Sequence, residues 1–224
     1  RYRTRWRAAD MATVEEVLNV ARRELGIKEA PPYSNQVKYN TWYYGHAVSG
    51  KAYPWCMVFV QWCFDQAGAA KLLPLRTASC GALMRAAQKA GLWVTGDYRP
   101  GDVVIYDFPG GGATDHTGLV EQVTPKGVTA IEGNTSLAGS QSDGGMVCRK
   151  NRPWKEIVGA VRPRYEKEVT QMDNTPSPAH KEGVECAVKN GILTGDAAGD
   201  LKLRESVTRQ QLCTMLLRFA KWKG

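Results

Sequence analysis

Three short stretches of the sequence carry, in chain order, a cysteine, a histidine, and an acid followed by an amide. Cys56 comes two residues after Pro54, His116 stands in an Asp-His-Thr-Gly run, and Glu132 precedes Asn134 in a Glu-Gly-Asn-Thr-Ser run. A thiol, an imidazole and a polar group that orients the imidazole are the parts that nucleophilic catalysis by cysteine needs. The pattern therefore predicts a hydrolase with a cysteine nucleophile.

The local pattern also predicts the elements that position these residues. Cys56 opens an apolar stretch that predicts a helix starting after Pro54 and ending near Gly68. The unpaired N–H groups and the macrodipole at a helix N-terminus stabilise a thiolate. Residues 115–123 and 127–132 predict two strands joined by a turn. As antiparallel neighbours, these strands carry a base and its orienting partner side by side.

Each of these residues also has a simpler role open to it. Cys56 is also consistent with a small apolar residue buried in the core, which is the commonest environment of a free cysteine. Glu132 fits a solvated glutamate, and the run around Asn134 fits ordinary turn chemistry. Among the three histidines, His116 alone stands in strand-like sequence. The catalytic interpretation depends on all of these residues occurring together.

Four runs, in order and at compatible spacing, resemble the cysteine- and histidine-dependent amidohydrolase/peptidases, known as the CHAP family. The resemblance extends from Thr13 to Tyr165 and rests on Pro54-Trp55-Cys56 with Phe59, Trp62 and Cys63, on Arg99-Pro100-Gly101-Asp102, on Asp115-His116-Thr117-Gly118, and on Ile131-Glu132-Gly133-Asn134-Thr135. It implies a papain-like α+β fold that cleaves amide bonds in bacterial peptidoglycan. It also implies Cys56 as nucleophile, His116 as general base and then acid, Glu132 as orienter of the imidazole, and Asn134 as further polar support.

Two aromatic residues and the expectation of no cofactor complete the predicted site. Trp42 and Tyr44 precede the nucleophile helix closely enough to line a substrate groove, although aromatic side chains are more often core. Some CHAP domains carry calcium upstream of the cysteine. Residues 33–53 hold no Asp or Glu, so we expect no metal, and the chemistry asks for no other cofactor.

The six cysteines include no C-x-x-C pair and no zinc-site spacing. We expect buried thiols at Cys63, Cys80, Cys148, Cys186 and Cys213. A chain of this size does not need a disulfide framework. A nucleophilic thiol must stay reduced, which favours synthesis in a cytoplasm.

The pattern predicts one catalytic domain over residues 11–165. Helices at 13–25, 55–67 and 79–90 are expected to pack on an antiparallel sheet of strands near 102–106, 115–123, 127–132, 146–149 and 157–162. Helices followed by strands indicate the α+β class. Residues 1–10, with four arginines and one aspartate, are expected to be a basic arm or leader.

A second module follows a linker at residues 166–178, which ends in prolines. Residues 179–224 predict a small helix-loop-helix unit that resembles the S-layer homology module through His180, Ala187-Val188, Asn190-Gly191-Ile192-Leu193-Thr194-Gly195-Asp196, Gly199-Asp200 and Val207-Thr208-Arg209. The resemblance implies binding of secondary cell-wall polysaccharide through Arg209. Gln211 stands where that family usually has an acid, and one copy is present where three are common. A single copy should therefore pack on the catalytic domain or self-associate.

These features together favour a phage or prophage endolysin, made in the host cytoplasm and acting on the cell wall after release. The scissile bond stays open between N-acetylmuramoyl-L-alanine amidase and endopeptidase. The alternatives are a host wall-remodelling or antibacterial effector amidase and a catalytically inactive wall-binding protein. The net charge of +8 suits attraction to anionic wall polymers. No nucleic-acid-binding motif and no apolar run long enough to span a membrane stand in the sequence.

Overall fold

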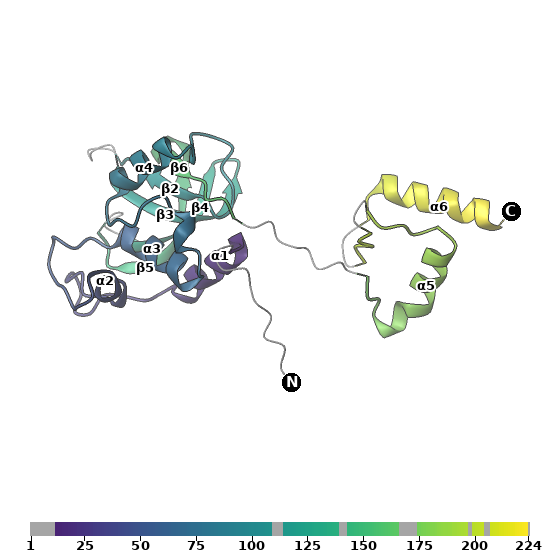
Figure 1. The fold of residues 1–224 in the computed structure, drawn as a ribbon, viewed down its shortest axis with the longest axis horizontal. Coiled ribbons are helices and arrows are strands. Elements are labelled where there is room, and N and C mark those ends of the chain that lie inside the picture. Colours follow the sequence, from purple (N-terminus) through teal and green to yellow (C-terminus); the bar gives the residue numbers. More distant parts are fainter. Residues whose placement is uncertain are drawn as a thin grey trace. The chain divides into compact units, whose positions relative to one another are not determined.

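The computed structural model describes residues 12–108, 114–138, 143–165, 174–196, 199–203 and 207–223. It divides into two compact units, Arg1–Lys167 and Glu168–Gly224 (Figure 1). The predicted basic arm at residues 1–10 lies outside the described residues, as do residues 166–173 of the predicted linker.

Among its described residues, the first unit contains four α-helices, and capping side chains precede two of them. The helices are α1 (Val14–Arg23), α2 (Lys38–Tyr44), α3 (Cys56–Gln66) and α4 (Cys80–Lys89), with a short 3-10 turn, η1, at Ala70–Leu72. Thr13 caps α1 in a capping box: its backbone N–H donates to Glu16 Oε2 at 2.9 Å, and Thr13 Oγ1 accepts from the Glu16 N–H at 3.2 Å. Ser79 caps α4 by accepting from the N–H of Ala82.

The strands of this unit form one six-stranded sheet among the described residues. They are β1 (Trp93–Val94), β2 (Val103–Tyr106), β3 (His116–Thr124), β4 (Gly127–Thr135), β5 (Met146–Pro153) and β6 (Ile157–Val161), with the 3-10 turn η2 (Trp154–Glu156) before β6. Their order across the sheet is β1-β6-β2-β3-β4-β5, and every pairing is antiparallel. The register places Tyr106 opposite His116 and Cys148 opposite Glu132.

Helices cover one face of the sheet. α3 contacts β3 and β4 as well as α1 and α2, while α4 contacts β1 and β6 (Figure 1). Side chains alternate along each strand, so Ile131 belongs to the core under the helices. Its neighbour Ala130 belongs to a smaller core on the opposite face, with Val104, Tyr106, Val120, Val128 and Ala160. This arrangement confirms the predicted α+β class.

The run Arg99-Pro100-Gly101-Asp102 builds the entry to β2. Asp102 is buried, accepts from the backbone N–H of Arg99 at 2.8 Å, and accepts two bonds from Arg162 at 3.0 and 2.9 Å. Gly101 has a φ of 87°, which favours glycine, and its carbonyl accepts from the Tyr165 hydroxyl at 2.7 Å. The run therefore has a structural role: it links Arg162 and Tyr165, at the end of the domain, to the start of β2.

Three local predictions were wrong. The helix α2 was not predicted, because its seven residues carry little apolar periodicity; it ends at Gly45, whose φ is 78°. The strand β4 continues to Thr135, beyond the predicted end at residue 132. Strand β5 continues to Pro153, beyond the predicted end at residue 149. Glu132 therefore lies within a strand, although its sequence context suggested a strand end.

The second unit contains the 3-10 turn η3 (Pro178–His180) and the helices α5 (Lys181–Lys189) and α6 (Arg209–Lys223). Thr208 and Gln211 form a capping box at the start of α6, with bonds of 2.7 and 3.2 Å between backbone and side chain. Two helices enclose little volume, so Cys186 and Cys213 are exposed. The prediction that these two thiols are buried was wrong. No helix in the described ranges has the length and apolar character needed to cross a membrane.

Candidate active site

Cys56 is the first residue of α3, and Trp55 is the N-cap. Only 6% of Cys56 is exposed, and the helix buries nearly all of its length in the core. The N–H groups at the start of the helix point toward the thiol, and that of Met57 hydrogen-bonds to it. The predicted helix start is confirmed, and it places the sulfur where a negative charge is stabilised.

His116 is the first residue of β3 and is 0% exposed. Its Nε2 lies 3.0 Å from Glu132 Oε2, across the pairing of β3 with β4. The preceding Asp115 fixes this end of the strand by accepting from the Phe108 N–H at 2.6 Å. Tyr106 stacks on the imidazole with ring centroids 6.0 Å apart. Since Nε2 is engaged by Glu132, Nδ1 is the ring nitrogen left to exchange a proton with the thiol of Cys56.

Glu132 is fully buried and ion-paired on two sides. Arg152 on β5 donates from Nε to Oε1 at 2.9 Å and from Nη2 to Oε2 at 2.6 Å. Arg152 was missed in the sequence because β5 was expected to end three residues earlier. A longer strand β5 would have indicated this contact. Arg152 pairs with Val128 in the register, and alternation places Val128 and Glu132 on the same face of the sheet.

The ionisation of the three groups follows from these contacts. A hydrogen bond from the Cys80 thiol is the largest influence that holds the pKa of Cys56 well below its ordinary range; the interaction with His116 adds to it, and burial opposes both. Burial works against a charged His116, but the interactions with Cys56 and Glu132 outweigh it and raise the imidazole pKa to about 9. The site is therefore poised as a thiolate and an imidazolium.

Glu132 stays ionised although it is completely buried. Burial by itself raises the pKa of a carboxyl group, but the hydrogen bonds from Arg152 and His116 outweigh it and hold the pKa of Glu132 below its ordinary value. Glu132 consequently supports the imidazolium as an anion.

Cys80 is a second residue of the site that the sequence did not reveal. It is the first residue of α4, and its buried thiol donates a hydrogen bond to Cys56. Its own pKa is raised well above the ordinary value, first by that hydrogen bond and then by burial, so it stays a thiol. Burial likewise raises the pKa of Cys63. Cys63 is thus a neutral core residue, as predicted.

The glycines of the two strand motifs allow close packing around the acid. A Cβ on Gly118 would lie 2.6 Å from Cγ of Glu132. A Cβ on Gly133 would lie 2.6 Å from Cβ of Phe59 and 2.8 Å from the Trp55 ring. A real Cβ cannot approach these atoms so closely, so the two glycines let β4 lie against β3 and against the first turn of α3.

Asn134 is fully buried, and its φ of 55° is in the left-handed region that asparagine tolerates. It lies where the register between β4 and β5 shifts, and its carbonyl accepts from the Gly144 N–H at 3.0 Å. The structure shows Glu132 as the partner of the imidazole; Asn134 follows it in the same strand.

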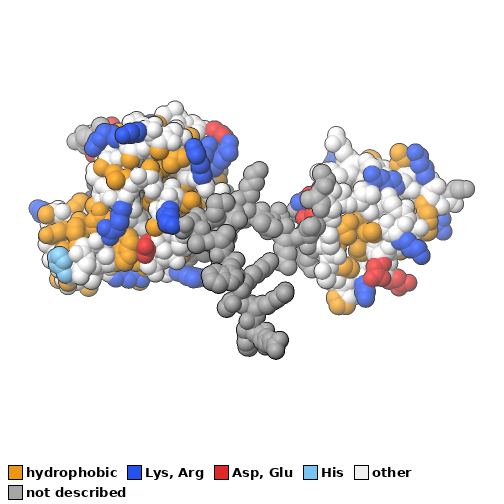
Figure 2. All heavy atoms as spheres, in the orientation of Figure 1, with side chains coloured by type: hydrophobic (Ala, Val, Ile, Leu, Met, Phe, Trp, Pro, Cys, Tyr) orange, Lys and Arg blue, Asp and Glu red, His pale blue; other side chains and the backbone are white. Residues whose placement is uncertain are grey.

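Trp42 and Tyr44, on α2, are half-buried members of a row of aromatic rings. The row runs Trp42–Tyr43–Tyr44–Tyr53, with centroid distances of 6.1, 5.0 and 5.1 Å. The guanidinium of Arg76 lies 4.3 Å from the centre of the Tyr43 ring. Figure 2 shows hydrophobic side chains gathered on the surface over α2. The row leads from α2 to the segment that enters α3.

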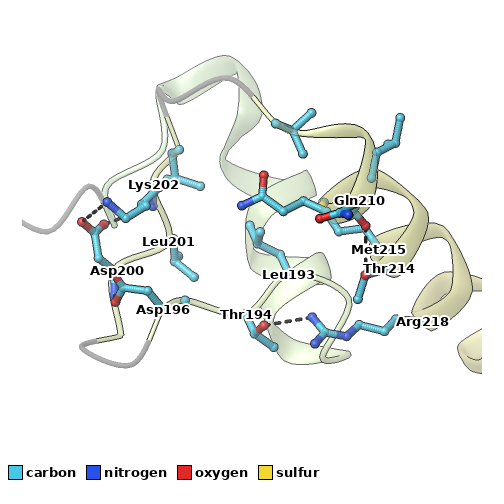
Figure 3. A pocket seen from close by; sticks show the side chains of 15 residues that line it. Leu193, Thr194, Asp196, Asp200, Leu201, Lys202, Gln210, Thr214, Met215 and Arg218 are labelled. Carbon is cyan, nitrogen blue, oxygen red and sulfur yellow. Dashed lines mark hydrogen bonds and ion pairs between the residues drawn. The ribbon is translucent and has the colours of Figure 1, made fainter.

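Arg209 is the exposed first residue of α6 in the second unit. That unit contains a cavity of about 580 Å³ lined by residues of the loop after α5 and of α6. Arg218 donates to Thr194 Oγ1 at 2.9 Å at one end of it, and Lys202 pairs with Asp200 at the other, with Leu193 and Leu201 between them (Figure 3). Among the described residues, Arg218 lines this cavity and Arg209 does not. In the described part of the chain, no cluster of His, Cys, Asp and Glu could hold a metal ion.

Residues 48–134 match the CHAP domain family. The match covers less than half of the chain and lies within the first unit. This domain is found in peptidoglycan amidases and peptidases that depend on a cysteine and a histidine, and the matched range includes Cys56, His116 and Glu132. The chain has no match among curated proteins. The crystal structure of Ly7917 is similar with a TM-score of 0.38 and 16% identity, over 67% of this chain and 62% of that one, so this chain spans less than two thirds of Ly7917.

Proposed function

We propose that the CHAP domain hydrolyses an amide bond of bacterial peptidoglycan, with Cys56 as nucleophile. The proposal is carried by one observation: His116 Nε2 lies 3.0 Å from Glu132 Oε2 with neither side chain exposed, beside a cysteine at the tip of α3. A buried imidazole held by a carboxylate is the arrangement that activates a cysteine for acyl transfer. The family match supports the substrate class.

The reaction follows from the resting charges. The Cys56 thiolate attacks the amide carbonyl carbon, and the backbone N–H of Cys56 at the helix start stabilises the oxyanion. The imidazolium of His116 gives its Nδ1 proton to the leaving nitrogen as the C–N bond breaks, which leaves a thioester on Cys56. His116 then takes a proton from water, and the hydroxide releases the new carboxyl group and regenerates the thiolate.

The test is release of defined fragments from purified peptidoglycan by the full chain. Mass spectrometry of the new ends distinguishes an N-acetylmuramoyl-L-alanine amidase from an endopeptidase. Cys56→Ala should lower the rate by at least about three orders of magnitude. Cys63→Ala, which removes a buried thiol two turns along the same helix, should keep it. Retained activity in Cys56→Ala would overturn the assignment.

The aromatic row of Trp42 and Tyr44 is proposed as part of the substrate groove. Its rings precede Cys56 and are half-buried, so flat apolar faces remain available for sugar or peptide contacts. Trp42→Ala and Tyr44→Ala should raise KM on peptidoglycan fragments and change kcat little. An unchanged KM in both variants would assign the row to packing alone.

The second unit is proposed to bind wall polysaccharide. Its support is the Thr-Arg capping segment at Arg209 and the cavity with a cation at each end, Arg218 and Lys202. A chain ending at Tyr165 should cleave soluble muropeptide at the full rate but bind intact walls more weakly. Arg209→Ala and Arg218→Ala, compared in the full chain by wall pull-down, decide which arginine contributes. Equal binding by the truncated chain would assign this unit to self-association or stabilisation.

An endolysin role is the finer form of the proposal. The basic charge of +8 favours concentration on anionic walls. Purified protein added to susceptible cells should lyse them from outside, and salt should weaken the effect. Cleavage of purified walls without lysis of cells would favour the alternative, a wall-remodelling or effector amidase.

A further inference from the structure

Arg152 makes the most extensive set of contacts around the proposed catalytic acid. Only 4% of Arg152 is exposed, and its guanidinium grips Glu132 in two parallel bonds of 2.9 and 2.6 Å. Oε1 takes Nε, and Oε2 takes both Nη2 and, at 3.0 Å, the imidazole Nε2 of His116. One carboxylate oxygen is therefore shared between the guanidinium and the imidazole.

We propose that Arg152 is a positioning residue of the hydrolase, which fixes the plane and the charge of Glu132 so that Oε2 holds His116. This inference rests on the proposed function, because it assigns Arg152 a part in that reaction. Arg152 acts through Glu132, to which its guanidinium donates two hydrogen bonds.

A fork of two parallel bonds restricts rotation of a carboxylate, because both oxygens must stay in the plane of the guanidinium. Lysine cannot do the same, since its ammonium is a point charge with rotatable donors. In Glu132, the restriction aims Oε2 at the imidazole. Without it, the carboxylate could turn about its own axis and leave Nε2 of His116 without a fixed partner.

Aromatic rings hold Arg152 and His116 together. The guanidinium lies 4.7 Å from the centre of the Phe108 ring and 5.2 Å from that of Tyr106. The same two rings lie against His116, each with a centroid distance of 6.0 Å. Movement of Arg152 would therefore disturb the packing of the imidazole as well as its hydrogen bond.

The surroundings of Glu132 leave it dependent on Arg152. Besides His116, the groups that face it are Tyr106 on β2 and Cys148 on β5, and burial raises the pKa of both, so they stay neutral. Glu156, at 3.8 Å from Arg152 Nη1, adds a further negative charge on the outer side of the guanidinium. Arg152 is the permanent cation that opposes the burial of the Glu132 charge.

The test compares Arg152→Met, Arg152→Lys and a matched control, Arg149→Met. Arg149 lies on the same strand and forms its own pair with Glu121, at 3.0 Å, but at the surface. The first measurement is the pH profile of Cys56 alkylation by iodoacetamide, followed by mass spectrometry of the Cys56 peptide because Cys186 and Cys213 are exposed. The second is turnover on muropeptide, with thermal unfolding as a check on the fold.

In Arg152→Met, the acid limb of Cys56 alkylation should move to higher pH by about one unit or more, and turnover should fall about ten- to a hundredfold. Arg152→Lys should restore most of the pH profile, because it keeps the charge, but only part of the turnover, because it lacks the fork. Arg149→Met should leave both unchanged. If Arg152→Met does not fold, the turnover of Arg152→Lys still tests the positioning role.

An unchanged alkylation profile in a folded Arg152→Met variant, or full turnover in Arg152→Lys, would overturn the positioning role and assign Arg152 to structural packing alone. Alkylation needs no peptidoglycan. If the wild-type chain fails to cleave peptidoglycan while its Cys56 profile shifts on loss of Arg152, the substrate assignment fails and the positioning role stands.

Discussion

The Nε2 atom of His116 and the Oε2 atom of Glu132 lie 3.0 Å apart, sixteen residues apart in sequence and wholly shielded from solvent. Antiparallel pairing of β3 with β4 brings the two strands together, and Gly118 gives the acid the room to approach. Because the pair is buried in an environment of low dielectric constant, its electrostatic interaction is strong. The charge state of the site, and so its pH dependence, follows from this contact.

The pH profile of kcat/KM on soluble muropeptide should be bell-shaped. At low pH Cys56 is protonated and inactive, and because its pKa is lowered, the acid limb should lie well below the ordinary thiol range. At high pH His116 loses the proton that it must give to the leaving nitrogen, so activity should fall near its pKa of about 9. An acid limb near 6.5 without an alkaline limb would instead assign the loss of activity at low pH to protonation of the His116 imidazole.

Glu132→Gln should lower both turnover and stability. The neutral amide cannot support the imidazolium, and it takes from the buried guanidinium of Arg152 the carboxylate that pairs with it at 2.6 Å, leaving the more distant Glu156 at 3.8 Å. Breaking a buried pair on one side costs about 3–5 kcal/mol, to be measured by urea denaturation.

Glu15→Gln is the control for that substitution, because it breaks a pair with Arg22 in which the glutamate is half exposed. It should change the free energy of unfolding by about 1 kcal/mol or less. Equal free energies of unfolding for the Glu132 and Glu15 variants would show that the buried pair contributes no more to stability than the exposed pair.

Gly118→Ala should impair catalysis without adding or removing a polar group. The new Cβ would lie 2.6 Å from Cγ of Glu132, so the acid must shift. A displacement of about 1 Å at such a site costs roughly a hundredfold in rate. Gly96→Ala, at a position with no atom within 4 Å of the new Cβ, should retain wild-type turnover on muropeptide. If both variants turn over alike, Glu132 has more freedom than its contacts indicate.

Cys80→Ala should shift the acid limb of the pH profile to higher pH by about one unit. The Cys80 thiol donates a hydrogen bond that favours the thiolate of Cys56, and alanine cannot replace it. Cys63→Ala removes a buried thiol of the same core and should leave the limb in place. If the acid limb of Cys80→Ala lies at the same pH as that of the wild type, His116 and the helix N-terminus account for the stabilisation of the thiolate.

Local patterns in the sequence determined the elements that present Cys56 and His116. Pro54 and the apolar run after it predicted where α3 begins, and the pattern over residues 13–25 predicted α1; both helices are confirmed. Such features depend on residues a few positions apart, so they are visible in a linear sequence. The resemblance to the CHAP family added the individual roles of Cys56, His116 and Glu132.

Only the tertiary structure decided what surrounds these three residues. Glu132 lies inside β4 because Gly133 packs against Phe59, and a Gly-Asn-Thr run gives no sign of that contact in the sequence. The contacts of Arg152 with Glu132 and of Cys80 with Cys56 join residues 20 and 24 positions apart. Strand register and helix packing set such contacts. The charge state of the site depends on them, which is why the sequence identified the reacting groups and the folded chain decided how they ionise.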